Sequence, residues 1–236
     1  MSIKLPTYDK DGNNIFDPRD RRGIKEKYIT ILHEKVLLRY LPKGFNKKIA
    51  IDLGCGYGRI TPIIARKKWR VIGIDPDPQL IKIARHNNPR IKFIVGGLPN
   101  LPLVNNSVDL MVMHNLIRPL HILSRLHCIE GVGKYFKNDG ILFVVDNIRD
   151  NHPDYVSEGA IIKMFVKEGF KLEKRMPIRR GRWILLYLIR YGLVPIFLLD
   201  KVAQYEMRKM KNIKSRPRFC YYNVLFIFRK KNAFHE

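Results

Sequence analysis

Short apolar runs alternate with segments of helical spacing along most of the chain. The runs that predict strands lie at 49–53, 70–74, 91–95, 108–113, 141–146, 170–176 and 219–229. Apolar residues three and four positions apart predict helices between them, most clearly at 20–41, 78–86 and 157–168. Strands that alternate with helices are typical of an α/β fold, in which helices cover both faces of a mostly parallel sheet.

The first predicted strand runs directly into a loop with a glycine at every second position. These glycines are Gly54, Gly56 and Gly58, and Asp52 lies two residues before the first of them. Glycine adopts backbone angles that other residues avoid and lets a ligand contact the main chain. A strand, a glycine loop and a helix in succession are typical of nucleotide binding. A dinucleotide loop, G-x-G-x-x-G, would need a third glycine at Arg59, so the pattern here is D-x-G-x-G-x-G instead.

An acid at the end of the second strand supports a ligand site. Asp75 lies 23 positions after Asp52, which is where folds of this kind bind the hydroxyl groups of a ribose. A carboxylate suits this task because it accepts hydrogen bonds from two neighbouring hydroxyls at once. Asp77 could share the role, and the alternative is that Asp75 is an ordinary turn acid before Pro76.

Taken together, these segments resemble the class I S-adenosylmethionine (SAM) dependent methyltransferases, and within them the small-molecule, type 11-like group. The D-x-G-x-G-x-G run resembles the first motif of that family. The stretch 98–109, Leu-Pro-Asn-Leu-Pro-Leu-Val-Asn-Asn-Ser-Val-Asp, is similar to the family's segment between the third and fourth strands. The turn 138–140 resembles the family's L-K-P-G-G turn without its proline. The resemblance covers about residues 45–176 and implies a Rossmann-like sheet of seven strands, whose last strand is antiparallel and lies between the fifth and sixth.

The resemblance also implies SAM as the cofactor, S-adenosylhomocysteine as its product, and no metal. Asp52 would bind the amino group of the methionine part, Asp75 the ribose, and Leu98 would flank the adenine. The implied cofactor-binding residues are Asp52, Gly54, Cys55, Gly56, Gly58, Asp75, Pro76, Gly97, Leu98, His114 and Asn115. The family commonly has G-D-A after the third strand, where the acid meets adenine. Here Gly96-Gly97-Leu98 leaves only the backbone for that contact.

His114 at the end of the fourth strand is the candidate catalytic residue. Methyl transfer from a sulfonium mainly needs alignment and exclusion of water, so the sequence need not contain a catalytic cluster. His114 could act as a general base, because the pKa of histidine is ordinarily near neutrality. It could equally be a polar group at the methionine end of the cofactor. Asp146 and Asn147, at the end of the fifth strand, are expected to border the acceptor.

The absence of two sequence motifs restricts the class of methyl acceptor. Enzymes that methylate amino groups of nucleic-acid bases carry (D/N)-P-P-(Y/F) after the fourth strand, whereas residues 114–117 read His-Asn-Leu-Ile. Enzymes that methylate C5 of cytosine need a nucleophilic cysteine beside a proline, and neither Cys55 nor Cys128 has that setting. The cysteines are few and scattered, so neither a disulfide framework nor a zinc site is expected.

The formal net charge of +24 favours anionic partners. Residues 157–236 hold 19 Lys and Arg against 6 Asp and Glu. Residues 1–20 are polar and lack the apolar core of a signal peptide, so we expect a cytoplasmic protein, with a position at the membrane surface as an alternative.

The expected organisation is an N-terminal segment and helix at 1–44, followed by a SAM-binding domain at 45–236. That domain includes a basic helical insert at about 177–218 before the last strand. The insert could be an amphipathic helical cap over the active site. The basic stretch 174–218 could also lie on a phospholipid surface or bind RNA phosphates.

The sequence therefore predicts a SAM-dependent methyltransferase with a small or lipid-like acceptor. An RNA methyltransferase, acting on tRNA or rRNA, is the enzymatic alternative, favoured by the charge. A module of the same fold that binds RNA or a partner without catalysis is the alternative of another class, motivated by the glycine at position 97.

Overall fold

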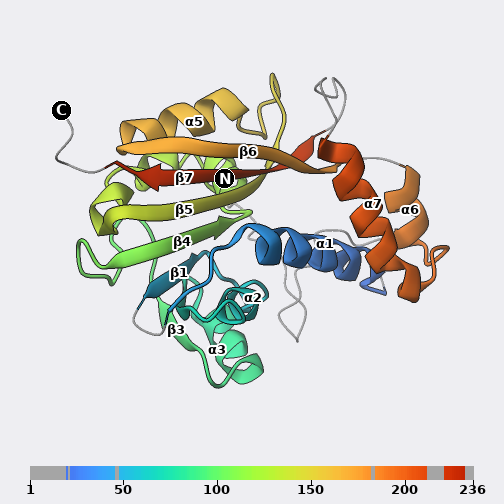
Figure 1. Cartoon of the computed structure of the whole chain (residues 1–236), viewed down its shortest axis with the longest axis horizontal. Coiled ribbons are helices and arrows are strands. Elements are labelled where there is room, and N and C mark those ends of the chain that lie inside the picture. Colours follow the sequence, from blue (N-terminus) through green and yellow to red (C-terminus); the bar gives the residue numbers. More distant parts are fainter. Residues whose placement is uncertain (1–19, 21, 46–47, 182–183, 212–220, 232–236) are drawn as a thin grey trace.

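The computed structural model describes residues 20, 22–45, 48–181, 184–211 and 221–231. Its strands form one seven-stranded sheet in the order β3-β2-β1-β4-β5-β7-β6 (Figure 1). They are β1 (Ile49–Leu53), β2 (Arg70–Asp75), β3 (Lys92–Val95), β4 (Val108–His114), β5 (Phe136–Ile148), β6 (Phe170–Arg180) and β7 (Tyr222–Lys230). β7 pairs antiparallel with both β5 and β6, as the family resemblance implies.

Helices cover both faces of this sheet. The α-helices are α1 (Ile24–Tyr40), α2 (Thr61–Ala65), α3 (Pro78–Asn87), α4 (Ile117–Ile122), α5 (Glu158–Lys167), α6 (Ile184–Arg190) and α7 (Leu199–Lys211), and short 3₁₀ turns are η1 (Leu126–Ile129), η2 (Val132–Tyr135) and η3 (Ile196–Leu198). One apolar core unites residues of α1, α2, α6 and α7 with one face of the sheet. A second core packs α5, η1 and η2 on the other face. The central strands are buried on both faces, which explains their nearly continuous apolar runs.

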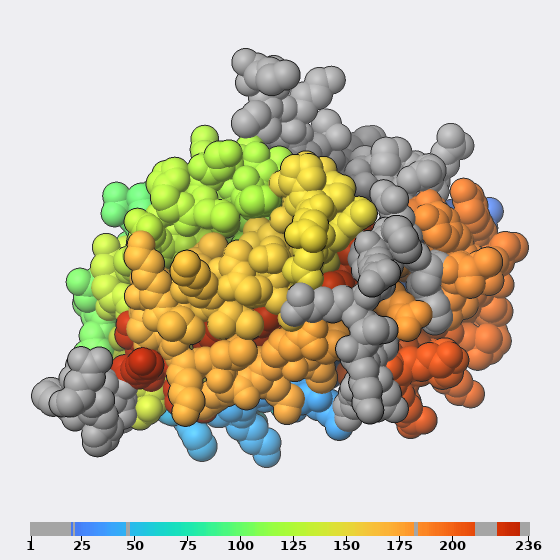
Figure 2. Space-filling model, turned by 90° about the horizontal axis from the view of Figure 1, so that it is seen from above, coloured from blue at the N-terminus to red at the C-terminus, as the bar shows by residue number. Residues whose placement is uncertain are grey.

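The order of the strands reverses between β1 and β4, which are neighbours in the sheet. In open α/β sheets a ligand binds outside the carboxyl ends of the strands at such a switch point. At that end of the sheet Figure 1 shows α1, α6 and α7 gathered together, and α7 contacts both α1 and β6. In Figure 2 the orange atoms of α6 and α7 make up one end of the molecule. These helices therefore form a cap, which we define as α1, α6 and α7.

The N-terminal helix is part of the main core. Tyr28, Leu32 and Val36 follow one another at four-residue spacing on α1, and each is completely buried. They belong to the same apolar cluster as Phe143 of β5 and Leu225 of β7. The helix begins four residues later than the sequence predicts, at Ile24 rather than residue 20.

Two strands are longer than their apolar runs predict. β5 begins at Phe136, so the expected turn at 138–140 lies inside the strand, next to an irregularity in its pairing with β4. β6 continues to Arg180, because it pairs with β7 as far as Tyr222 and absorbs two bulges on the way. The basic residues at 177–180, expected to open the insert, therefore belong to the sheet. Part of the last expected strand, at 219–220, and part of the insert, at 212–218, lie outside the described residues.

The cap buries apolar side chains on its inner side. Leu186 and Ile189 of α6, with Leu199 and Ala203 of α7, are buried in the core that α1 shares. The described part of the insert is thus a helical cap over the end of the sheet. None of the described helices has the length and the apolar character that crossing a bilayer requires.

Replacing Gly73 with alanine should destabilise the fold by about 1–3 kcal/mol, which is typical of overpacking. Gly73 lies in β2, and a Cβ there would come within 2.4 Å of the Phe93 ring on β3. Gly159→Ala is the matched control: a Cβ there meets no atom within 4 Å, and alanine favours the α5 helix. Urea unfolding should show a loss of stability for the first variant and none for the second. Equal stability of the two variants would contradict the close packing of β2 on β3.

Candidate functional site

The glycine loop between β1 and α2 is held against the end of β2. The amides of Gly54 and Cys55 both donate to the carbonyl oxygen of Ile74, at 2.8 and 3.1 Å. Gly56 has a φ of 53°, and a Cβ at this position would meet no atom within 4 Å. The backbone at Gly56 therefore borders open space, where a ligand can contact the main chain.

The other two glycines of the loop have a packing role as well. A Cβ at Gly54 would lie 2.9 Å from Leu116, and one at Gly58 would lie 3.0 Å from Asn88 and 3.1 Å from Phe93. Both glycines also have a positive φ. They allow the loop to pack tightly, so Gly56 is the position of the three that faces open space.

Asp75 joins the second strand to the glycine loop. Its Oδ2 accepts from the amide of Gly56 at 2.9 Å, and its Oδ1 accepts from the amide of Asp77 at 3.0 Å. Burial raises the pKa of Asp75 above its ordinary value. Each carboxylate oxygen has a second lone pair, so Asp75 can still accept from a hydroxyl of a ligand. The side chain of Asp77 accepts instead from the amides of Gln79 and Leu80 and caps α3.

Two buried oxygens lie at the carboxyl ends of β1 and β4 without a hydrogen-bond partner in the described residues. They are Oδ1 of Asp52 and Oδ1 of Asn115. The other oxygen of Asp52 accepts from the hydroxyl of Thr61 at 2.6 Å. Burial raises the pKa of Asp52 to about 7. Because unpaired buried acceptors are costly, these two atoms indicate a place where a donor from a ligand would bind.

The remaining predicted residues border the ends of β2 and β3. A Cβ at Gly97 would lie 3.3 Å from the Pro76 ring, so these two residues are close together. Leu98 is partly buried against the second apolar core. Cys55 is buried beside Phe93, and burial raises the pKa of its thiol, so this cysteine is a packing residue and not a nucleophile.

His114 belongs to a chain of polar side chains that runs from the glycine loop through α1 to β7 and β5. Arg59 donates to Nδ1 of His114 over 3.4 Å. Nε2 of His114 lies 3.0 Å from Nδ1 of His33, and Nε2 of His33 lies 3.1 Å from Oδ1 of Asn223. Asn223 in turn donates to Oδ1 of Asn147 over 3.2 Å.

The donors and acceptors along this chain determine which ring nitrogens of His114 and His33 carry a proton. A guanidinium can only donate, so Nδ1 of His114 accepts and its Nε2 carries the proton. His33 must then accept at Nδ1 and donate from Nε2 to Asn223. Burial, together with the charge of Arg59, lowers the pKa of both histidines well below the ordinary value. Both rings are therefore neutral near pH 7, each with its proton on Nε2.

This arrangement bears on the two roles considered for His114. Its Nδ1 lone pair accepts from Arg59, and its Nε2 holds a proton that is donated to His33. A general base needs a free lone pair, which His114 would gain only if Arg59 moved away. The geometry favours the second role, a polar group at the end of β4.

Asp146 has a structural task at the end of β5. Its Oδ2 accepts from the amides of Ile117 and Arg118 at 2.7 and 3.1 Å, at the start of α4. It is completely buried, and burial raises its pKa to about 6. Asp146 thus fixes α4 to the sheet, while Asn147 joins the polar chain.

Three members of the polar chain were not predicted as site residues from the sequence. Arg59 follows the glycine loop without a recognisable pattern, and Asn223 is a single polar residue in the apolar run of β7. His33 gave one usable signal, because it lies on the buried side of α1 between Leu32 and Val36. A lone polar residue on an apolar helix face must find a partner when it is buried.

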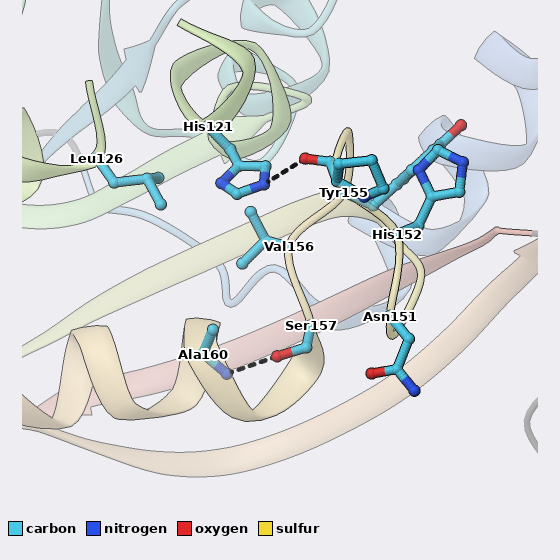
Figure 3. A pocket seen from close by; sticks show the side chains of 9 residues that line it. His121, Leu126, Asn151, His152, Tyr155, Val156, Ser157 and Ala160 are labelled. Carbon is cyan, nitrogen blue, oxygen red and sulfur yellow. Dashed lines mark hydrogen bonds between the residues drawn. The ribbon is translucent and has the colours of Figure 1, made fainter. Parts of the chain in front are cut away.

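A separate hollow lies between α4, η1 and the loop that joins β5 to α5 (Figure 3). His121, Leu126, Asn151, His152 and Tyr155 are among its lining residues. His121 is also hydrogen bonded to the carbonyl oxygen of Pro153, over 2.9 Å. None of the predicted cofactor-binding residues lines this hollow.

Comparison with known proteins agrees with this geometry. Residues 50–140 match a family described as a methyltransferase domain. The ubiquinone/menaquinone biosynthesis C-methyltransferase UbiE of Campylobacter jejuni is 28% identical over 148 residues, 60% of this chain and 59% of the relative. The chain thus spans about three fifths of the length of this relative.

Solved structures share the fold at low sequence identity. The YcgJ protein of Bacillus subtilis superposes with a TM-score of 0.59 at 15% identity, over 85% of this chain and 99% of that one. The geranyl diphosphate C-methyltransferase of Streptomyces coelicolor, solved with Mg²⁺, geranyl diphosphate and S-adenosyl-L-homocysteine, gives a TM-score of 0.64 at 11% identity, over 96% and 90%.

The sheet order and the glycine loop give the chain the Rossmann-like fold of these solved structures. The chain is thus similar to the class I SAM-dependent methyltransferases, through a methyltransferase domain at 50–140 and through relatives such as UbiE.

The residues present fit SAM. The free oxygens of Asp52 and Asn115 could accept from its cationic amino group, and the carboxylate of Asp52 would also supply the opposite charge. The open space beside Gly56 lies next to the remaining acceptor sites of Asp75, as a ribose would require.

Asp52→Asn should flatten the pH dependence of stability of the cofactor-free protein. With a folded pKa of about 7 and an ordinary unfolded pKa near 4, Asp52 keeps a proton on folding. Its contribution to stability is complete below about pH 4 and is lost as the pH rises to about 7. Asparagine resembles the protonated side chain and cannot titrate.

Urea unfolding between about pH 4 and about pH 8 checks this effect. Asp75 and Asp146 also have raised pKa values, so part of the slope should remain in the variant. Asp200→Asn, at an exposed acid on α7, is the control and should leave the slope over this range nearly unchanged. Parallel curves for wild type and Asp52→Asn would contradict the raised pKa.

The tautomers of the polar chain can be observed directly. Long-range ¹H–¹⁵N spectra should show His33 and His114 as neutral rings protonated on Nε2, unchanged from about pH 8 to about pH 6, because burial lowers the pKa of both. His33→Ala identifies the signals. An Nδ1-protonated His114, or a ring that titrates within this range, would be inconsistent with the chain.

Proposed function

We propose that this protein transfers a methyl group from SAM to a small, lipid-like acceptor. The proposal rests on groups that lie together at the switch point of the sheet. They are the Gly56 backbone, Asp75 and the free oxygens of Asp52 and Asn115. SAM would supply a methyl group on a sulfonium centre, whose carrier is a good leaving group.

The residues of the chain would mainly bind and align the reactants. Asp52 and Asn115 would hold the methionine end, Asp75 the ribose, and the backbone near Gly97 and Leu98 the adenine. The polar chain through His114 would fix the end of β4 beside the methyl group, with His114 as a base only if Arg59 moves. The cap would exclude water, which an in-line displacement requires more than it requires a base.

The cap also supports the choice of acceptor. Its inner side is mostly apolar, although Arg190 and Glu206 are also buried there, and α6 presents further apolar side chains outward, including Ile184 and Leu188. The named acceptors of two similar proteins, a quinone precursor and geranyl diphosphate, are likewise apolar or carry an apolar chain. RNA is the second candidate, because of the +24 charge.

Asp75→Ala should lower the affinity for S-adenosylhomocysteine by about 100-fold or more, because it removes hydrogen bonds to a charged group from both the ligand and the Gly56 amide. Titration calorimetry measures this change. Asp200→Ala, an exposed acid paired with Lys35, is the control and should bind like wild type. If the wild-type protein binds neither SAM nor its product at millimolar concentration, the enzyme hypothesis is rejected and the non-catalytic module remains.

Labelled methyl transfer identifies the acceptor class. Wild-type protein with methyl-labelled SAM should label the lipid or small-metabolite fraction of a cell extract, and Asp75→Ala should not. Label confined to the RNA fraction would replace the lipid-like acceptor by the RNA alternative.

A further inference from the structure

The α6 helix is apolar on both its inner and its outer side. Leu186 and Ile189 are buried against the cap. The outer residues are Ile184, Tyr187, Leu188 and Tyr191, which follow the i, i+3, i+4, i+7 spacing of one helix face and are 75%, 37%, 37% and 60% exposed. A helix that is apolar all round normally has both sides covered. In this chain the described residues cover only one.

The exposed apolar surface continues beyond the end of α6. Leu193, Ile196 and Phe197, in the turn that leads to α7, are 68%, 52% and 79% exposed. We name residues 184, 187, 188, 191, 193, 196 and 197 together the apolar tip. Among the described residues, eight of the thirteen large apolar side chains that are exposed lie between 184 and 205. Such a concentration marks an interaction surface, because single exposed apolar residues are normally scattered.

Basic side chains lie next to the apolar tip. The guanidinium of Arg22 would lie 3.3 Å from a Cβ at Gly192, in the turn after α6. On α7, Lys201 is exposed near the end that joins the tip, and Arg208 and Lys209 are exposed near the other end. Acids are scarce there: within 184–211, Glu206 is buried and Asp200 forms an ion pair with Lys35 over 2.6 Å. The tip thus combines insertable side chains with a basic border.

We propose that the apolar tip inserts into the surface of an anionic phospholipid bilayer. Apolar side chains would enter the boundary between head groups and acyl chains, and Arg22 and the α7 cations would contact the head groups. RNA is a poorer occupant, because the cation of α6, Arg190, is buried and lies over the Tyr187 ring. A second copy is also a poorer occupant, because two chains of +24 repel each other.

The location of the tip connects this surface with the proposed function, on which this step rests. α6 contacts α1, and α1 supplies His33 to the polar chain at the end of β4. If the apolar tip is inserted in a membrane, the cap would hold the donor site close to the bilayer. A lipid-like acceptor could then reach the site without crossing water.

Flotation of the full chain with vesicles tests the proposal. The vesicles are phosphatidylcholine with phosphatidylglycerol at about 3:1, and phosphatidylcholine alone is the uncharged comparison. Wild-type protein should float with the anionic vesicles and about tenfold less with the neutral ones. Leu193→Ser/Phe197→Ser should lower partition into anionic vesicles about tenfold or more, because both side chains are exposed in the free protein and would be buried in lipid.

Phe45→Ser is the matched control, since Phe45 is 69% exposed and lies between α1 and β1, outside the apolar tip. It should float like wild type. The proposal is overturned if wild-type protein does not float, or if both variants lose binding equally. It is also overturned if the tip residues instead support a dimer in sedimentation or binding to an RNA oligonucleotide.

Titration of the same variants with S-adenosylhomocysteine separates this proposal from the methyltransferase function. The tip variant should keep wild-type affinity, because neither residue is near the glycine loop. Loss of flotation with intact ligand binding is the expected result for that variant. If the wild-type protein floats but binds no S-adenosylhomocysteine, the proposed methyltransferase function is rejected and the proposed membrane binding is supported.

Discussion

The attachment of the glycine loop to the end of β2 is the interaction on which the site depends. One carbonyl oxygen, that of Ile74, accepts from two loop amides, and the carboxylate of Asp75 accepts from a third. These bonds fix the backbone of a segment that its glycines would otherwise leave free, which lowers the entropy cost of binding a ligand there. Because they join neighbouring parallel strands, the binding site has the stability of the sheet.

The polar chain has a comparable role for the cap. His33 connects α1 to β4 through His114 and to β7 through Asn223, so three distant parts of the chain share one set of hydrogen bonds. Its bonds are directional, and breaking one would leave a buried donor or acceptor unpaired. The apolar contacts of α1 supply burial, whereas this chain determines where the helix must sit over the sheet.

The insert helices of the cap, α6 and α7, contribute both to the buried core and to the exposed surface of the protein. Their inner apolar residues complete the core and close the end of the sheet, while the outer stripe of α6 stays in contact with water. A protein with such an excess of positive charge can keep this stripe exposed without associating with itself. The same charge would attract it to an anionic surface.

The sequence alone determined the sheet, the glycine loop and Asp75, because alternating apolar runs and a strand-end acid are local patterns. It gave no means to find the contact of His33 with Asn223, which lie 190 residues apart, or the donation from Arg59 that fixes the proton of His114. It missed the start of β5 at Phe136, because Phe136 is held by its pairing with Val108 of β4, while the polar residues 137–140 lie in an irregularity of that pairing. Nor could it tell which apolar side of α6 is buried. Burial and pairing between distant segments arise only when the chain packs, so tertiary structure decided them.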